Sequence, residues 1–130
     1  MAEFSDALSV TASGLKAQSR RLRHLSENIA NADTPGYHRK TVGFRTAFEA
    51  TGAPGQVELT RVRLDPTEPK QIYDPANPLA DESGHYAGSN VNLVIELADA
   101  REAQRSYEAN LKMFEQTRQM AQSLFDLLRK

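Results

Sequence analysis

Both ends of this chain repeat apolar side chains at a helical spacing, in runs that contain no proline. In the first run, Leu8, Leu15, Leu22 and Ile29 lie seven residues apart. The second run alternates steps of four and three through Leu93, Leu97, Ala100, Gln104, Tyr107, Leu111, Phe114, Arg118, Ala121, Phe125 and Leu128. This spacing is typical of helices that pack knobs into holes. We therefore predict a mainly α protein whose long N- and C-terminal helices pair as a coiled coil.

Glycine and proline indicate where the predicted helices end. Residues 4–31 contain one glycine, Gly14, and no proline, and residues 90–130 contain neither. The first helix should be followed by a type II turn over Thr34–Tyr37, because proline and glycine hold the second and third places of that turn. Asn92 is the predicted N-cap of the second helix.

The segment between the two runs predicts a small, irregular, β-containing region. Apolar alternation indicates a strand within Gln56–Asp65, with a bulge near Arg61, and a second strand over Gln71–Asp74. The residues Asp81–Gly84 predict a turn. The expected division of the chain is residues 1–32 for the N-terminal coiled-coil helix, 33–90 for the turn, loop and short β-strand segment, and 91–130 for the C-terminal coiled-coil helix.

Composition narrows the class of protein. The chain has 130 residues, 39% of them hydrophobic and 25% charged, which fits one soluble domain or one elongated subunit. A net charge of −1 argues against a general polyanion binder, and the absence of cysteine excludes disulfides and thiolate metal sites. No apolar run is long enough to span a bilayer, and the N-terminus lacks the pattern of a cleaved signal, so we expect no entry into the general secretory route.

The apolar surface of the predicted helices exceeds what two helices can cover. Near the C-terminus a wide apolar arc comprises Met120, Ala121, Leu124, Phe125, Leu127 and Leu128. Each fully buried leucine or phenylalanine contributes about 1.5–3 kcal/mol, so leaving several in water would cost much of a domain's stability. We predict that a neighbouring subunit covers this face. A monomeric helical hairpin, with its middle segment folded over the stripe, is the alternative that the pattern leaves open.

The predicted assembly interface follows from these stripes. It comprises Leu8, Leu15, Leu22, Leu25, Ile29, Leu97, Tyr107, Leu111, Phe114, Leu124, Phe125 and Leu128. The two polar residues on the second stripe, Gln104 and Arg118, either set the helix register or lie at the edge of a drifting stripe.

Polar residues give no pattern of catalysis or metal binding, and we predict no enzyme activity, no cofactor and no metal site. A basic cluster, Lys16, Arg20, Arg21, Arg23 and His24, has no interleaved aromatic residues and is best explained as a solvated helix face. The histidines lack a metal-binding spacing, and no Gly-x-Ser-x-Gly motif is present. A nucleic-acid binder is therefore a weaker alternative.

Charges in the second run fit a helix surface. Glu96 lies near the positive end of the predicted helix dipole. Asp99 and Glu102 are expected to pair with Arg101 and Arg105 along the same helix, each pair worth a few tenths of a kcal/mol.

The most informative stretch lies where the first helix ends. Here small and amide residues replace the apolar stripe: Ala30 and Ala32 permit close backbone approach, while Asn28 and Asn31 can satisfy the free backbone groups of the helix end. Taken alone, the two asparagines also fit an ordinary capped helix end.

Two sets of residues give a specific resemblance. Asn28, Ile29, Ala30 and Asn31, followed by Thr34, Pro35, Gly36 and Tyr37, resemble the N-terminal signature of bacterial flagellar rod and hook proteins. Tyr73-Asp74-Pro75, Asn77 to Asp81, Gly84-His85-Tyr86, Asn90 to Asn92, Glu96, and Tyr107, Ala109 and Asn110 resemble the FlgC type of proximal-rod protein. The chain is similar to the flagellar basal-body rod family over nearly its whole length, although its short Thr34–Gly36 loop resembles the FlgB form.

The resemblance implies a structural subunit of the proximal rod, which polymerises through its terminal helices into a torque-transmitting drive shaft around the export channel. It implies a place in the basal body, in a rod that crosses the periplasm, after export by the flagellar type III apparatus without a cleaved signal peptide. The implied partners are other copies of the chain and FlgB-, FlgF- and FlgG-type rod subunits, with the rod adaptor and membrane ring as further candidates, and neither nucleic acid nor a membrane span. The alternatives are another rod subunit such as FlgB, or a soluble helical adaptor or chaperone.

Overall fold

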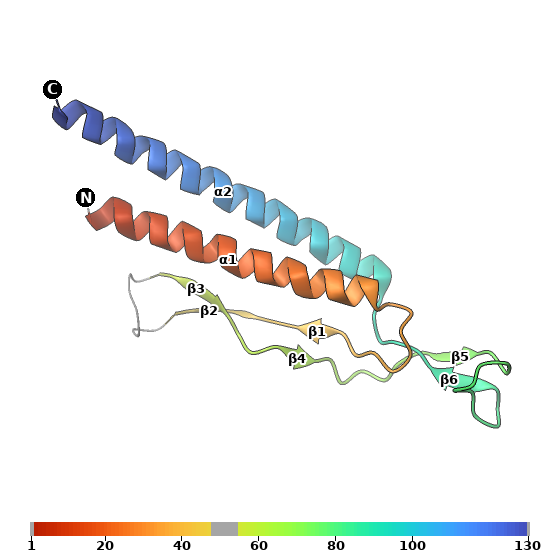
Figure 1. Cartoon of the computed structure of the whole chain (residues 1–130). Helices are drawn as coiled ribbons and strands as arrows, with labels where there is room; N and C mark the ends of the chain where they lie inside the picture. The colour runs from red at the N-terminus through yellow and green to blue at the C-terminus, as the bar shows by residue number, and fades with distance from the viewer. Residues whose placement is uncertain (1, 48–54, 130) are drawn as a thin grey trace. The chain divides into compact units, whose positions relative to one another are not determined.

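The computed structural model describes residues 2–47 and 55–129 and has two long terminal helices with a small β-containing middle (Figure 1). Helix α1 spans Ala2–Ala30 and helix α2 spans Leu93–Arg129. The strands are β1 (Lys40–Thr41), β2 (Phe44–Thr46), β3 (Val57–Leu59), β4 (Arg63–Leu64), β5 (Gln71–Tyr73) and β6 (His85–Ala87). Part of the predicted irregular segment, residues 48–54, lies outside the described residues. Neither described helix is both long and apolar enough to cross a membrane.

The strands form three antiparallel pairs, β1 with β4, β2 with β3, and β5 with β6. The predicted strand over Gln71–Asp74 is confirmed as β5. The single strand predicted within Gln56–Asp65 is wrong, because the chain changes partner there: β3 pairs with β2, and β4 pairs with β1. The change follows Thr60, which closes the first ladder with two hydrogen bonds of 2.8 Å to the backbone of Gly43.

The chain divides into two compact units, which are described separately. Unit 1 comprises Met1–Leu22, Gly43–Thr60 and Glu102–Lys130, so it holds the first part of α1, the β2–β3 hairpin and most of α2. Unit 2 comprises Arg23–Val42 and Arg61–Arg101, so it holds the end of α1, the pairs β1–β4 and β5–β6, and the start of α2.

In unit 1 the two helix segments lie antiparallel, because Arg21 contacts Glu102 while the earlier Gly14 lies against the later Asn110. The face of α2 that is buried or half-buried follows steps of four and three: Ala103, Tyr107, Asn110, Phe114, Thr117, Ala121 and Leu124. The predicted stripe shares three of these positions, whereas its positions Gln104, Arg118, Phe125 and Leu128 are exposed within the chain. Helix α2 is oriented about its axis so that Gln104 and Arg118 face solvent, and this orientation also leaves Phe125 exposed.

The predicted local signals at the element ends are confirmed. Tyr37 N donates to Thr34 O at 3.2 Å, and Gly36 has a φ of 75°, as a type II turn requires at its third residue. Asn92 caps α2, because its Oδ1 accepts from the backbone amides two and three residues later at 3.1 and 3.4 Å. The turn at Asp81 is closed by a hydrogen bond of 3.0 Å from the amide of Gly84.

Candidate functional site

A buried amide, Asn28, organises unit 2 from the end of α1. Its side chain has no exposed surface. Its Oδ1 accepts from the backbone N–H of Lys40 and from the hydroxyl of Tyr37, both at 2.8 Å. Its Nδ2 donates to the Lys40 carbonyl at 2.9 Å and to Glu96 Oε2 at 3.3 Å. Asn28 therefore uses two donors and two acceptor positions. It pairs with the backbone of β1 as a neighbouring strand would, and it ties that strand to α2.

Glu96 connects α2 to the same network. This side chain is fully buried in the first turns of α2, where a carboxylate favours the helix dipole. Its Oε1 accepts from Nε of Arg39 at 2.5 Å. The Arg39 guanidinium also lies 3.3 Å from Asp65 Oδ2 and 3.9 Å from Asp99 Oδ2. Because the buried carboxylate has both a cation and an amide donor, the cost of removing it from water is largely offset.

Asn90 fixes the segment that leads into α2. Its backbone N donates to Tyr37 O at 3.2 Å, and its Oδ1 accepts from the backbone N–H of Arg39 at 2.6 Å. Its Nδ2 donates to the carbonyls of Asp65 and Thr67 at 2.9 and 3.0 Å. One asparagine side chain thus joins three separate stretches of unit 2.

The end of α1 is closed by a second set of polar contacts. Asn31 Nδ2 donates to the carbonyl of Glu27 at 2.8 Å, and Thr34 Oγ1 donates to Asn31 Oδ1 at 3.0 Å. Ser89 Oγ donates to the carbonyl of Ala32. Asn31 therefore has the local capping role that the sequence predicts. For Asn28 that prediction is wrong, because its partners lie 9 to 68 residues away in the sequence.

Close contact between the helices of unit 1 depends on Gly14. A Cβ atom placed there would lie 3.1 Å from Asn110 Oδ1, tighter than ordinary van der Waals contact. Nearby, Arg21 Nη2 lies 2.5 Å from Glu102 Oε2, and its guanidinium lies 5.7 Å from the ring centre of Phe44. Glu102 therefore contacts α1, and Asp99 contacts Arg39, rather than the arginines predicted along α2.

Burial divides the predicted assembly residues into three groups. Leu25 is buried; Leu8, Leu15, Leu22, Ile29, Tyr107, Leu111, Phe114 and Leu124 are half-buried; and Leu97, Phe125 and Leu128 are 47, 50 and 71% exposed. Of the motif residues, Asn28 is buried, Ile29, Asn31, Tyr37, Tyr107 and Asn110 are half-buried, and Ala30, Thr34, Pro35, Gly36 and Ala109 are exposed. Met113, Met120 and Leu127, which the predicted interface leaves out, are also exposed.

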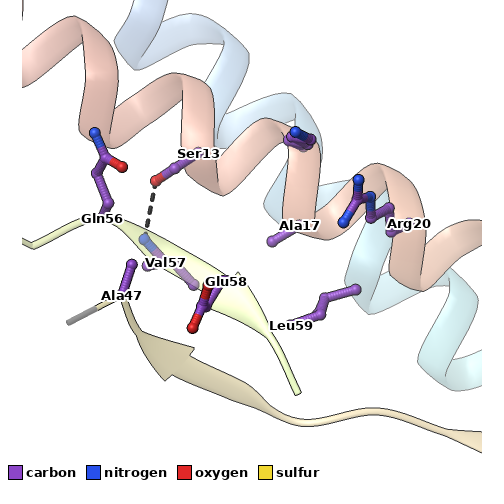
Figure 2. Close-up of a pocket in the computed structure, with 9 residues that line it drawn as sticks. Ser13, Ala17, Arg20, Ala47, Gln56, Val57, Glu58 and Leu59 are labelled. Atoms are coloured by element: carbon purple, nitrogen blue, oxygen red, sulfur yellow. Dashed lines mark hydrogen bonds between the residues drawn. The ribbon is translucent and has the colours of Figure 1, made fainter. Parts of the chain in front are cut away.

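The described surface of unit 1 contains grooves, and two of them are lined by residues of the predicted stripes or of the basic cluster. The first, of about 520 Å³, is largely apolar and is lined by Phe4, Gln116, Gln119, Met120, Ser123, Leu124 and Leu127. The second, which we call the basic groove, has about 250 Å³ and lies between α1 and the β2–β3 hairpin (Figure 2). It is lined by Ser13, Lys16, Ala17, Arg20, Ala47 and residues 56–59. A hydrogen bond of 3.0 Å from Val57 N to Ser13 Oγ links the two sides of the groove, α1 and β3.

Acid is expected to weaken the folded state. The hydrogen bond from Lys40 holds the pKa of Glu27 below its ordinary value, the hydroxyl of Thr67 does the same for Asp65, and Arg21 does so for Glu102. Because these pKa values are lower in the folded chain, their stabilisation is complete above the unfolded values of about 4 and is lost as pH falls through the folded ones.

Thermal unfolding followed by circular dichroism checks this expectation. The melting temperature should be nearly constant between about pH 5 and 7 and should fall below about pH 4. Asp65→Asn should lower the melting temperature at neutral pH and reduce the acid dependence. A melting temperature that rose on acidification would contradict the assignment.

The fold and this site define a class of protein: a helical structural subunit that leaves apolar helix surface exposed. Among residues 2–47 and 55–129, no three histidine or carboxylate side chains gather as a metal site. Family models match two regions, one described as "Flagella basal body rod protein" over residues 8–38 and one as "Flagellar basal body rod FlgEFG protein C-terminal" over residues 82–127.

Curated relatives agree with these matches. A flagellar basal-body rod protein FlgC of Agrobacterium fabrum is 45% identical over 136 aligned positions, which cover 99% of this chain and 98% of the relative. FlgC of Aquifex aeolicus is 36% identical over 97% of this chain and 98% of the relative, and FlgC of Salmonella typhimurium is 34% identical over 85 and 87%. The chain belongs to the flagellar basal-body rod protein family. It is a structural subunit of the proximal rod that assembles with other rod subunits in the basal body, and it is not an enzyme.

Proposed function

We propose that the terminal helices pair as a coiled coil and that the exposed apolar side chains of α2 form the interface through which the chain polymerises. The observation that carries this proposal is the exposure of Phe125, Leu127 and Leu128, at 50, 68 and 71%. Three such side chains close together on one helix end lose several kcal/mol of favourable burial if they stay in water. A packed neighbour would recover that free energy.

The pattern on α2 supports two separate uses of one helix. The stripe from Ala103 to Leu124 is covered within the chain, while Met113, Met120 and the C-terminal residues remain exposed. A helix with two apolar sides suits the wall of a tube, where each subunit packs on its own partner helix and on the next subunit. Residues 1–32 and 91–130 would form this inner layer around the export channel, and residues 33–90 would contact neighbours.

The same proposal includes the export route of the chain and its neighbours in the rod. The chain would reach the rod through the flagellar type III export apparatus and would join FlgB-, FlgF- and FlgG-type subunits in a rod that crosses the periplasm. Torque transmission would then depend on many packed helix seams, because a stiff shaft needs close packing and no chemical step. The similarity to FlgC proteins supports this assignment rather than a soluble adaptor or chaperone.

Replacing Phe125 and Leu128 by aspartate tests the proposed interface. Both are exposed within one chain, so the substitution should change the stability of the isolated protein by less than about 0.5 kcal/mol. At a packed interface each buried charge would cost several kcal/mol, so incorporation into basal bodies and swimming should be lost. The measurement is the amount of the chain that copurifies with basal bodies, together with motility in soft agar.

Lys112→Asp is the matched control, since it places an aspartate at an exposed position of α2 without removing an apolar side chain. Leu111 and Phe114 are poorer probes, because both are half-buried within the chain and their loss would also affect folding. Normal swimming of the Phe125→Asp/Leu128→Asp variant would contradict the proposed interface.

A further inference from the structure

The loop between β5 and β6 is held in shape by its own hydrogen bonds. Asp74 N donates to Gly84 O at 2.8 Å, and Asp81 N donates to His85 O at 2.9 Å. Asp81 Oδ1 accepts from the backbone N–H of Ser83 at 2.9 Å. Gly84 has a φ of 81°, and a Cβ atom there would lie 2.8 Å from the ring of Tyr73. The loop is therefore preformed, and little ordering would be needed when it binds.

This loop presents apolar and acidic side chains together. Tyr73 and Leu79 are 67 and 62% exposed. The carboxylates of Asp74 and Glu82 are exposed and make no hydrogen bond or ion pair with the residues that the structure describes. Between Lys70 and Arg101 the sequence contains no lysine or arginine. We call Tyr73, Asp74, Leu79 and Glu82 the hairpin tip. Its acidic side chains fit a groove with unpaired basic residues at its edge and some apolar lining.

The basic groove of unit 1 has this complementary chemistry. Lys16 and Arg20 stand one turn apart on α1 at its edge, and neither has an ion-pair partner among the described residues. The one acidic lining residue, Glu58, is already paired with Arg45 Nε at 2.6 Å. Apolar lining comes from Ala17, Val57 and Leu59, among others (Figure 2). The volume of the groove, about 250 Å³, leaves room for a side chain from another copy.

We propose that the hairpin tip of one copy docks into the basic groove of a second copy, with Asp74 and Glu82 beside Lys16 and Arg20 and with Leu79 against the apolar part of the lining. This inference rests on the proposed function, since it requires that the chain polymerises. The contact joins two different surfaces, so each copy keeps a free tip and a free groove. Repeated contacts of this kind build a ring or an open helical filament rather than a closed dimer.

Charge reversal with rescue tests the docking. The variant Lys16→Glu/Arg20→Glu should reduce incorporation into basal bodies about tenfold, because like charges would then face each other. Adding Asp74→Lys/Glu82→Lys to the same chain should restore incorporation, a result that a folding defect could not give. Arg101→Glu/Arg105→Glu, with the same spacing and charge change on α2, should behave as the unmodified chain.

Crosslinking gives an independent test, because the chain has no cysteine of its own. An Arg20→Cys chain and a differently tagged Glu82→Cys chain, produced together and assembled in basal bodies, should form a disulfide-linked pair of the two masses under mild oxidation. An Arg105→Cys chain with the Glu82→Cys chain should give little of this species.

Several results would overturn the docking proposal. They are normal incorporation of the Lys16→Glu/Arg20→Glu variant, failure of the added Asp74→Lys/Glu82→Lys change to restore it, and equal crosslinking in the Arg105→Cys control. Loss without rescue would mean that the basic groove binds another anionic partner. If Phe125→Asp/Leu128→Asp blocks incorporation while groove reversal does not, the proposed function stands and the docking contact fails.

Discussion

Asn28→Asp is expected to lower the free energy of unfolding by about 3–5 kcal/mol. The new carboxyl would replace the amide that lies 3.3 Å from Glu96 Oε2, so two acidic groups would meet in a site without exposed surface. The Lys40 carbonyl, now 2.9 Å from Nδ2, would also lose its donor. Urea unfolding followed by circular dichroism at neutral pH measures the loss.

The matched control for this change is Asn31→Asp, an identical substitution three residues later. Asn31 is half-buried and its Nδ2 makes one hydrogen bond, to the carbonyl of Glu27. The expected loss is about 1 kcal/mol. If both variants lost the same small amount, Asn28 would be an ordinary helix-end residue, and the network would not determine the stability of unit 2.

Glu96→Ala is expected to lower the free energy of unfolding by about 3 kcal/mol, because it removes one partner of a buried ion pair. The Arg39 guanidinium would lose its hydrogen bond to Oε1, and Asn28 Nδ2 would lose one of its two acceptors. Arg39 is 24% exposed and also faces Asp65, so solvent and a second carboxylate limit the damage.

A double-mutant cycle with Arg39→Met separates the coupling of the pair from other effects. The double variant should be less destabilised than the two single losses added together, because no unpaired charge stays buried. Asp99→Ala serves as control: its carboxylate is 3.9 Å from Arg39 and 41% exposed, so its removal should cost less than about 0.5 kcal/mol. Additive single losses would show that Glu96 and Arg39 act independently.

Hydrogen bonds join four residues of unit 2 into one network: Asn28, Glu96, Arg39 and Asn90. Their hydrogen bonds connect the end of α1, strand β1 and the start of α2 within unit 2. Asn28 therefore acts inside the chain, while the motif positions Thr34 to Gly36 are exposed.

The elements with strong local signals were predictable from the sequence. The bounds of α2 follow from the absence of glycine and proline, its N-cap from Asn92, and the type II turn from Pro35 and Gly36. The β3–β4 break was not predictable, because alternating apolar residues do not reveal a change of strand partner. β1 and β2 were missed because each has only two or three residues, too few to show alternation.

The candidate site, too, was predictable from the sequence only in part. The sequence identified Asn28, Asn31 and the following turn as the informative stretch, but assigned both asparagines to the helix end. No local pattern indicates that Asn28 bonds to Glu96, 68 residues later. Likewise, two stripes with steps of four and three fit α2: they share Tyr107, Phe114 and Ala121 and differ by one residue at the positions between. Packing against α1 selects the stripe through Asn110.

The sequence by itself determined the two terminal helices, their capping, and an excess of apolar surface that calls for neighbours, because spacing, glycine, proline and capping residues act through local geometry. The tertiary structure decided which stripe of α2 is covered, which strands pair and which acid meets Arg39. Those choices depend on contacts between residues far apart in the chain, and a sequence pattern does not encode them locally.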